Sequence, residues 1–165
     1  MANLREGYRI IDEPGPTRGP WIPVNPFWPL LSLVLTGILP GVLWFLYNGR
    51  ALGSATWRRQ ALVAGAGVLG SLACALALGA ARPSIPASAF PYLGLSLVAW
   101  KVMIGYLLHI DQARSVELYQ YFGGRLGKGF LLLILVLVLS VFLGTLAHNQ
   151  SPILGALFGE RFFLS

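Results

Sequence analysis

Long apolar runs separated by short polar connections dominate the pattern of this chain. Three runs, at residues 60–80, 90–110 and 129–147, have few interruptions, and a fourth, at 27–47, contains glycine and proline breakers. Each approaches or exceeds the ~20 residues that an α-helix needs to span ~30 Å of hydrocarbon. The pattern predicts an all-α membrane protein whose helical membrane domain covers residues 27–147.

The stretch LTGILPG, residues 35–41, decides the topology of the first run. If the helix continues through it, residues 27–47 form one crossing kinked at Pro40, and the chain has four transmembrane helices. If the chain turns back there, the run is a re-entrant hairpin and three spans remain. The length of the run suits one crossing. We therefore expect four spans, with three spans plus a re-entrant hairpin as the alternative.

The segments that flank the membrane domain carry apolar residues of their own. Residues 1–26 are rich in proline, which fixes φ and removes a backbone donor, so they predict an extended extramembrane arm. Trp21 in this arm indicates contact with a neighbouring surface. In the tail, residues 148–165, apolar side chains that include Phe158 and Phe162 fall near one helical face, as in an interfacial helix.

Composition and charge support a membrane location. The chain is 56% hydrophobic and only 11% charged, whereas about a quarter of the residues of soluble domains are charged. The net charge of +6 comes mostly from residues in short connections beside apolar runs. This placement favours anionic lipid headgroups over nucleic acid as the partner. The loops at 48–60 and 110–128 are predicted to be cytoplasmic, with these basic anchors: Arg50, Arg58, Arg59, Arg125 and Lys128.

Small residues form a stripe along the run at 60–80. Ala66, Gly70, Ala73 and Ala77 follow one another at spacings of four, three and four. Small residues let helix backbones approach closely in lipid. We expect a packing face here, directed to a helix of this chain or of another subunit.

Lys101 is the residue that is hardest to place in a membrane. It lies about eleven residues into its run, and none of the apolar runs contains an Asp or Glu. A lysine at the centre of a span costs ~2.5–3.5 kcal/mol on insertion scales. Three interpretations compete: the side chain snorkels to a headgroup, it pairs with an acid or cofactor carboxylate on another subunit, or it acts in transport.

The sequence offers few candidates for chemistry. His109 and Asp111 stand at the end of the same run, but metal sites usually need three or four ligands. His109 could be a single axial ligand of a haem or pigment held by a larger assembly, and a polar belt at the membrane boundary is the simpler interpretation. Nucleophile elbows, zinc-protease motifs and P-loops are absent from the sequence. We therefore expect neither catalytic nor metal-binding residues, and no enzyme.

One stretch carries a resemblance to a known group of proteins. In LPGVLWFLYNGRALGSATWRRQALVAGAG, Asn48 is followed by Ala51-Leu52-Gly53 and then by a basic stretch that opens the next helix. This stretch resembles uncharacterised small bacterial multi-pass inner-membrane proteins with an N-x-x-ALG motif. The resemblance implies a bacterial inner-membrane location and brings no activity or ligand with it.

These observations together predict a non-enzymatic accessory or structural subunit of a larger membrane complex. We expect it to contact the bilayer and other membrane subunits through the small-residue face, the N-terminal arm and the C-terminal tail, and not nucleic acid. The alternative is a small transporter or channel component that acts as a homo-oligomer.

Overall fold

The computed structural model describes residues 22–148, and its regular elements in this range are helices apart from one isolated β-bridge. The prediction of an all-α fold is confirmed for this part of the chain. Two short 3₁₀ turns, η1 (Arg82–Ser84) and η2 (Ala87–Ala89), join the third and fourth α-helices. The α-helices are α1 (Phe27–Thr36), α2 (Ile38–Ala51), α3 (Trp57–Ala81), α4 (Phe90–Tyr121) and α5 (Gly129–His148).

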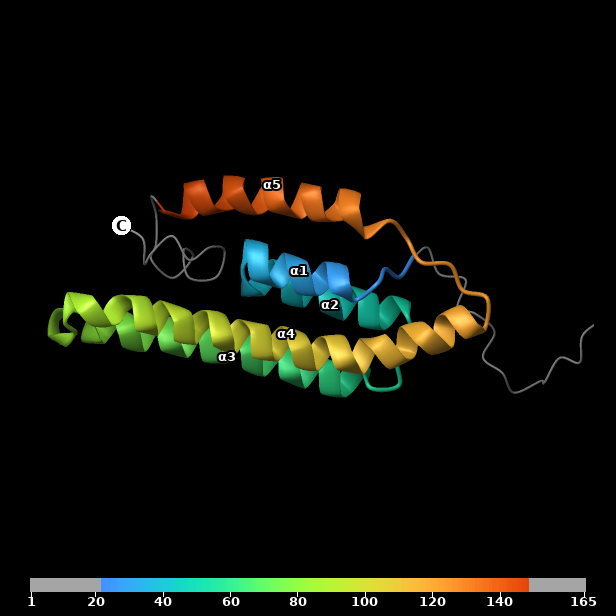
Figure 1. The fold of residues 1–165 in the computed structure, drawn as a ribbon, viewed down its shortest axis with the longest axis horizontal. Helices are drawn as coiled ribbons and strands as arrows, with labels where there is room; N and C mark the ends of the chain where they lie inside the picture. The colour runs from blue at the N-terminus through green and yellow to red at the C-terminus, as the bar shows by residue number, and fades with distance from the viewer. Residues whose placement is uncertain (1–21, 149–165) are drawn as a thin grey trace, which may run out of the picture.

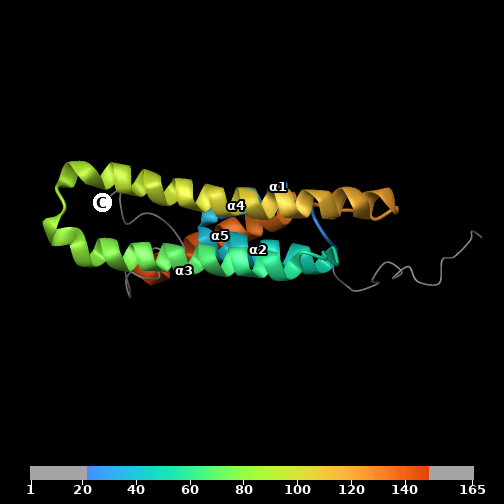
Figure 2. The same cartoon turned by 90° about the horizontal axis from the view of Figure 1, so that it is seen from below.

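The helices form two hairpins and a separate fifth helix. The long helices α3 and α4 run side by side in opposite directions, as both views show (Figures 1 and 2). The shorter α1–α2 hairpin lies between this pair and α5 (Figure 1). Its tip ends well short of the link that joins α3 to α4, so it covers only part of the length of these helices.

The structure corrects the prediction for residues 27–47. A single crossing helix kinked at Pro40 is wrong, because the run forms two helices that fold back on each other. The backbone N–H of Val24, before α1, donates a hydrogen bond of 2.7 Å to Oδ1 of Asn48, near the end of α2. The two ends of the run therefore lie together, as the re-entrant alternative described.

The break lies at Gly37 rather than at Pro40. Gly37 has φ 103° and ψ 172°, a region of backbone space that is essentially restricted to glycine. Pro40 is the third residue of α2. The first four N–H groups of a helix have no intrahelical partner, so a proline at this position costs no helical hydrogen bond. Pro40 therefore fits the start of α2 and does not kink a continuous helix.

Close packing holds the two arms of the α1–α2 hairpin together. A Cβ built on Gly41 would overlap Leu33, so only glycine lets the two backbones approach this closely. A shared core then joins the hairpin to the long helices. Its buried members are Leu33, Ile38, Val42, Phe45, Ala64, Ile104 and Leu108.

The α3–α4 pair is packed in the same way. A Cβ built on Gly67 would lie 2.7 Å from a side-chain carbon of Ile104, and the indole Nε1 of Trp100 donates to the carbonyl oxygen of Gly67 at 3.3 Å. The buried residues of α3 are Gln60, Ala64, Gly67 and Ser71. Their spacing of four, three and four defines one helical face that looks into the molecule.

The fifth helix is attached at its N-terminal end. The indole of Trp28 packs against Gly129 and meets the ring of Phe130 edge to face, with 6.0 Å between ring centroids. Just before α5, the N–H of Gly127 donates to the carbonyl oxygen of Pro23 at 2.8 Å. Among the described residues, the backbone of α5 lies closest to α1, and Leu133 of α5 also packs against the buried Trp44 of α2.

Two helices have the length and composition needed to cross a membrane. They are α3, and α4 from Pro91 to Tyr121. The stretches Phe27–Thr36 and Gly129–Leu143 are shorter apolar helices, so four spans are not confirmed. Three predicted contact residues, Trp21, Phe158 and Phe162, lie outside the described residues, as do almost all of the predicted arm and tail.

Candidate functional site

A cluster of buried side-chain amides joins three helices at the end of the molecule where α2 finishes. Asn48 of α2, Gln60 of α3 and Gln112 of α4 are each 0% exposed. Asn48 Nδ2 donates to Gln112 Oε1 at 2.8 Å, and Gln112 Nε2 donates to Gln60 Oε1 at 3.0 Å. We call these three residues the amide cluster.

Every polar atom of the amide cluster has a partner. Gln112 Nε2 also donates to the carbonyl oxygen of Phe45 at 2.6 Å, and Asn48 Oδ1 accepts from the Val24 backbone. Gln60 Nε2 donates to hydroxyls in the α2–α3 turn. Buried amides without partners are costly, whereas a completely bonded group fixes one arrangement of its helices. The cluster therefore sets the relative positions of α2, α3 and α4 and of the segment before α1.

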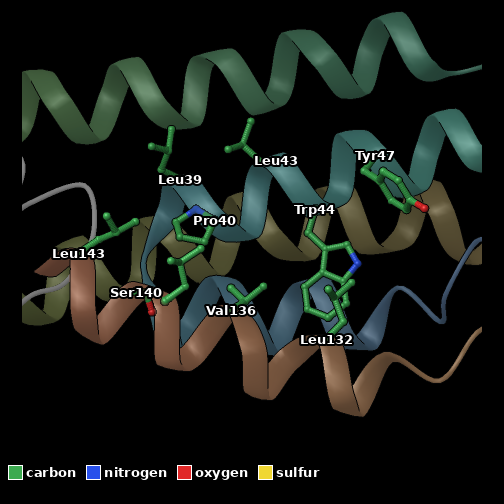
Figure 3. A pocket seen from close by; sticks show the side chains of 10 residues that line it. Leu39, Pro40, Leu43, Trp44, Tyr47, Leu132, Val136, Ser140 and Leu143 are labelled. Atoms are coloured by element: carbon green, nitrogen blue, oxygen red, sulfur yellow. The ribbon is translucent and has the colours of Figure 1, made fainter. Parts of the chain in front are cut away.

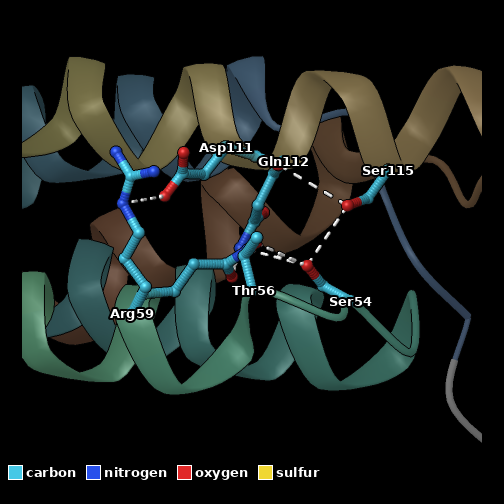
Figure 4. Close-up of polar contacts among 7 residues, drawn as sticks. Ser54, Thr56, Arg59, Asp111, Gln112 and Ser115 are labelled. Carbon is cyan, nitrogen blue, oxygen red and sulfur yellow. Dashed lines mark hydrogen bonds and ion pairs between the residues drawn. The ribbon is translucent and has the colours of Figure 1, made fainter.

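Three hydroxyls continue the cluster beyond Gln60 (Figure 4). Ser54 Oγ and Thr56 Oγ1 each accept from Gln60 Nε2 at 3.0 Å, and Ser115 Oγ donates to Ser54 Oγ at 3.2 Å. Beside these hydroxyls, Arg59 Nε lies 3.4 Å from Asp111 Oδ2. Figure 4 shows the ion pair bridging α3 and α4 next to the amides. The polar end therefore extends from buried amides to a salt bridge whose arginine is exposed and whose aspartate is largely covered.

The amide cluster explains the sequence stretch that begins at Asn48. A Cβ on Gly49 would overlap Gln60 Oε1, so glycine makes room for the amides. Ala51 is buried, and Gly53 has φ +60° in the turn that follows α2. Each of these small residues lets the chain leave α2 and enter α3 beside the cluster.

Lys101 lies on the inward face of α4. It is 7% exposed and shares its helical face with Ile104, Leu108 and Gln112. Gly105, one turn further along, packs on Leu30 and Leu33 of α1. Because α1 and α4 run in opposite directions (Figure 1), Lys101 is level with the C-terminal end of α1, where a helix dipole favours a cation. Its predicted contact with lipid or a partner subunit stays a prediction.

An apolar groove lies between α2 and α5. It encloses about 640 Å³, and its lining residues come from α2 and from α5 (Figure 3). Pro40 and Trp44 lie on the α2 side, and Val136 and Ser140 on the α5 side. Its volume falls in the range of about 300–1,000 Å³ that is typical of small-molecule sites. Trp44 is 5% exposed, and its Nε1 has no hydrogen-bond partner among the described residues.

The predicted small-residue stripe faces mostly away from this chain's own helices. Gly70 is partly buried against Trp100, where a Cβ would lie 2.6 Å from the indole. Ala66, Ala73 and Ala77 are exposed. The inward-facing residues Gly67 and Ser71 each follow a member of the predicted stripe by one position, so the inward face and the stripe point in different directions around α3. The three exposed alanines are therefore available to another helix.

The structure separates His109 from Asp111. Asp111 pairs with Arg59, whereas His109 is partly buried and its Nδ1 has no hydrogen-bond partner in the described part of the chain. No three His, Cys, Asp or Glu side chains between residues 22 and 148 could hold a metal ion together. An axial role for His109 towards a haem or pigment stays a prediction. The single cysteine, Cys74, is exposed.

The predicted basic anchors gather at the end that carries the amide cluster. Arg50 lies near the end of α2 and over the ring of Trp57, with 5.8 Å to the centroid. Arg58 and Arg59 open α3, and Arg125 and Lys128 precede α5. All five side chains are exposed.

Sequence reasoning missed Gln60 and Gln112 as structural residues. Each stands at the end of an apolar run, which is also where polar residues meet a membrane boundary. The available signal was periodicity, because Gln112 follows Leu108 by four residues and Gln60 precedes Ala64 by four.

Comparison of the chain with family models, with curated proteins and with solved structures finds no match. The resemblance to small bacterial membrane proteins therefore stays a prediction. Arguments about function rest on the geometry of this chain alone.

Proposed function

We propose that this chain is a multi-pass protein of the bacterial inner membrane that serves as a non-enzymatic accessory subunit of a larger membrane complex. Exposed large apolar side chains along the helices support the membrane location. Soluble monomers rarely expose contiguous apolar patches above a few hundred Å². Here such side chains extend over α3, α4 and α5, among them Leu62, Leu69, Leu76, Leu95, Leu131, Leu135 and Phe142.

The proposed topology has three spans, α3, α4 and α5, and a re-entrant α1–α2 hairpin. With 10 residues, α1 is only about 15 Å long, half of the ~30 Å hydrocarbon core. Non-helical backbone inside a membrane must be buried in protein or line water. Thr36 is 2% exposed, Gly37 is buried and Ile38 is 0% exposed, which supports a tip covered by protein.

Charge supports placing the amide-cluster end in the cytoplasm. Apart from Lys101 inside α4, six basic residues of the described range lie at that end and one, Arg82, lies in the opposite link. Basic residues in short loops favour the cytoplasmic side. The six are Arg50, Arg58, Arg59, Arg114, Arg125 and Lys128.

The observation that carries the accessory role is the incomplete packing beyond the hairpin tip. In that half of the molecule, described contacts join α3 to α4, but α5 makes no extensive contact with either. Ala73 and Ala77 face outward from α3 there. Exposed small residues allow another helix to approach closely. A partner subunit that packs on these alanines would complete the assembly.

Transport by a homo-oligomer is the second candidate function. The folded-back hairpin and the buried Lys101 near its tip favour it, since re-entrant segments and intramembrane charges mark many ion and substrate paths. The groove beside the hairpin is lined almost entirely by apolar side chains, however, which does not suit an ion path. We therefore place the accessory role first.

Native mass measurement separates the two candidates. The full chain is extracted with a mild detergent through a C-terminal tag, and its mass and partners are determined. We expect a stoichiometric complex with other subunits. Replacement of both Ala73 and Ala77 by Trp should release the partner, whereas the control Gly79→Trp, at an exposed position on the opposite side of α3, should retain it. A lone monomer would contradict the accessory role, and a pure homo-oligomer would favour transport.

A further inference from the structure

We propose that the groove between α2 and α5 binds one acyl chain of an anionic phospholipid of the cytoplasmic leaflet. This inference rests on the proposed membrane location, and it goes beyond the accessory role because it names a specific ligand. Three features of the groove support it: its length, the charges at one of its ends and the indole inside it.

The length of the groove matches one leaflet. Its α2 wall runs from Leu39 to Tyr47, about 12 Å of helix, and its α5 wall from Leu132 to Leu143, about 16 Å. Half of a hydrocarbon core is about 15 Å. In the proposed topology the groove begins at the cytoplasmic boundary and ends level with the tip of the hairpin, in the middle of the membrane. A single acyl chain of the cytoplasmic leaflet covers this depth.

Basic residues continue both walls at the cytoplasmic end. Arg50 follows Tyr47 by three residues on α2, so the two lie on the same side of that helix. Lys128 lies in the connection immediately before α5, four residues ahead of Leu132. Both side chains are exposed, and neither Asp nor Glu lines the groove. An apolar channel that opens between two cations is complementary to an acyl chain with a negatively charged headgroup.

The third feature is the indole of Trp44. Its ring lines the groove, and its Nε1 is buried with no hydrogen-bond partner among the described residues (Figure 3). A buried N–H without an acceptor is rare in proteins. Trp44 lies six residues before Arg50, about 9 Å along the helix. The ester carbonyl of a phospholipid whose headgroup meets Arg50 lies at this level, so a shift of the indole towards the groove would bring its N–H to an acceptor.

Native mass spectrometry of the full chain in detergent tests the proposal. The protein is incubated with an equimolar mixture of phosphatidylglycerol and phosphatidylcholine that carry identical acyl chains. We expect one retained phosphatidylglycerol per chain. Because each basic residue near the headgroup adds roughly five-fold in affinity, the preference over phosphatidylcholine should be at least that large.

Two sets of variants locate the bound lipid. Val136→Trp fills the groove with its indole and should remove most of the retained lipid. Its control, Val138→Trp, lies on the opposite side of the same helix at a position that is 63% exposed, and it should retain the lipid. The double variant Arg50→Gln, Lys128→Gln leaves the groove intact and should bind both lipids equally.

Three results would overturn the proposal: equal retention of the two lipids by the wild-type protein, no retention of either, or unchanged retention by Val136→Trp. A carbonate wash of cell membranes is run in parallel. If the chain stays in the washed membranes but retains no phosphatidylglycerol, the lipid site fails and the membrane location stands. If the wash releases the chain, both proposals fail.

Discussion

The two faces of α2 differ in how completely the chain covers them. The face that carries Phe45 and Asn48 is closed: both residues are 0% exposed, and their partners come from α3 and α4. The face that carries Leu43 and Trp44 borders a groove, and Leu43 is 57% exposed. The comparison shows that one helix can be fixed on one side by core packing and hydrogen bonds while its other side is left for a partner or a lipid.

The largest difference between the faces should come from a pair of truncations. Phe45→Ala removes a completely buried ring from the closed face and should lower the free energy of unfolding by about 3–5 kcal/mol. Leu43→Ala on the open face should cost less than about 1 kcal/mol, because solvent or lipid already surrounds this side chain. Unfolding titrations in detergent measure both values. Equal losses would contradict the distinction between the faces.

Loss of one amide should weaken the closed face almost as much. Gln112→Leu leaves two side-chain groups without a partner, the Asn48 Nδ2 and the Gln60 Oε1, and removes the second hydrogen bond to the Phe45 carbonyl, which keeps its helical one. Each orphaned buried group costs about 1–3 kcal/mol, so we expect a total of about 2 kcal/mol or more. Gln120→Leu, at an exposed position of the same helix, is the control and should change stability little. The same unfolding titration compares the two variants.

The next prediction concerns Gly37, the residue at which α1 ends and the chain folds back into α2. Gly37→Ala places a Cβ at φ 103° and ψ 172° and should cost about 1–3 kcal/mol. Gly79→Ala provides the matched control, because Gly79 is helical, has no atom within 4 Å of a built Cβ and no positive φ. Thermal melts followed by circular dichroism should therefore show a lower midpoint only for the Gly37 variant. An unchanged midpoint would mean that the turn at residue 37 does not require glycine.

The smallest effect should come from the salt bridge at the edge of the closed face. Arg59→Gln removes the ion pair with Asp111, in which the arginine side chain is 67% exposed and the aspartate side chain 11%. Surface pairs contribute about 0–1 kcal/mol, and because water reaches the arginine, the loss should stay near this range and should shrink further as salt is added. Unfolding titrations at low and high salt check this dependence. A large, salt-independent loss would mean that the pair belongs to the buried cluster.

The sequence was sufficient to predict the helices but not the way in which the first run is threaded. The runs at 60–80, 90–110 and 129–147 have no strong internal breakers, so hydropathy alone locates α3, α4 and α5. The first run has the same length as a crossing helix. Because proline is the stronger helix breaker, the kink was predicted at Pro40, whereas the chain breaks at Gly37. The conformation of Gly37 decides the fold-back, and a glycine's φ cannot be read from its neighbours in sequence.

The site was harder to predict than the fold for a related reason. Asn48 stood out because of the motif around it, but the other two amides of the cluster, Gln60 and Gln112, are 12 and 64 residues away. Only the packing of α2 against the α3–α4 pair brings the three together. Ala73 and Ala77 share one helical stripe by their spacing, yet whether that stripe faces this chain depends on a rotation of about one residue along α3.

Cysteine labelling tests the central claim, the fold-back of residues 27–51, most directly. Single cysteines replace Ile22, Ala55 or Ser88 in a Cys74→Ala background, and an impermeant thiol reagent is applied to intact and to permeabilised cells. All three positions are exposed in the structure. We expect Ser88→Cys to react in intact cells, and both Ile22→Cys and Ala55→Cys to react only after permeabilisation. Reaction of Ile22→Cys in intact cells, with Ala55→Cys still protected, would mean that the first run crosses the membrane and would contradict the account.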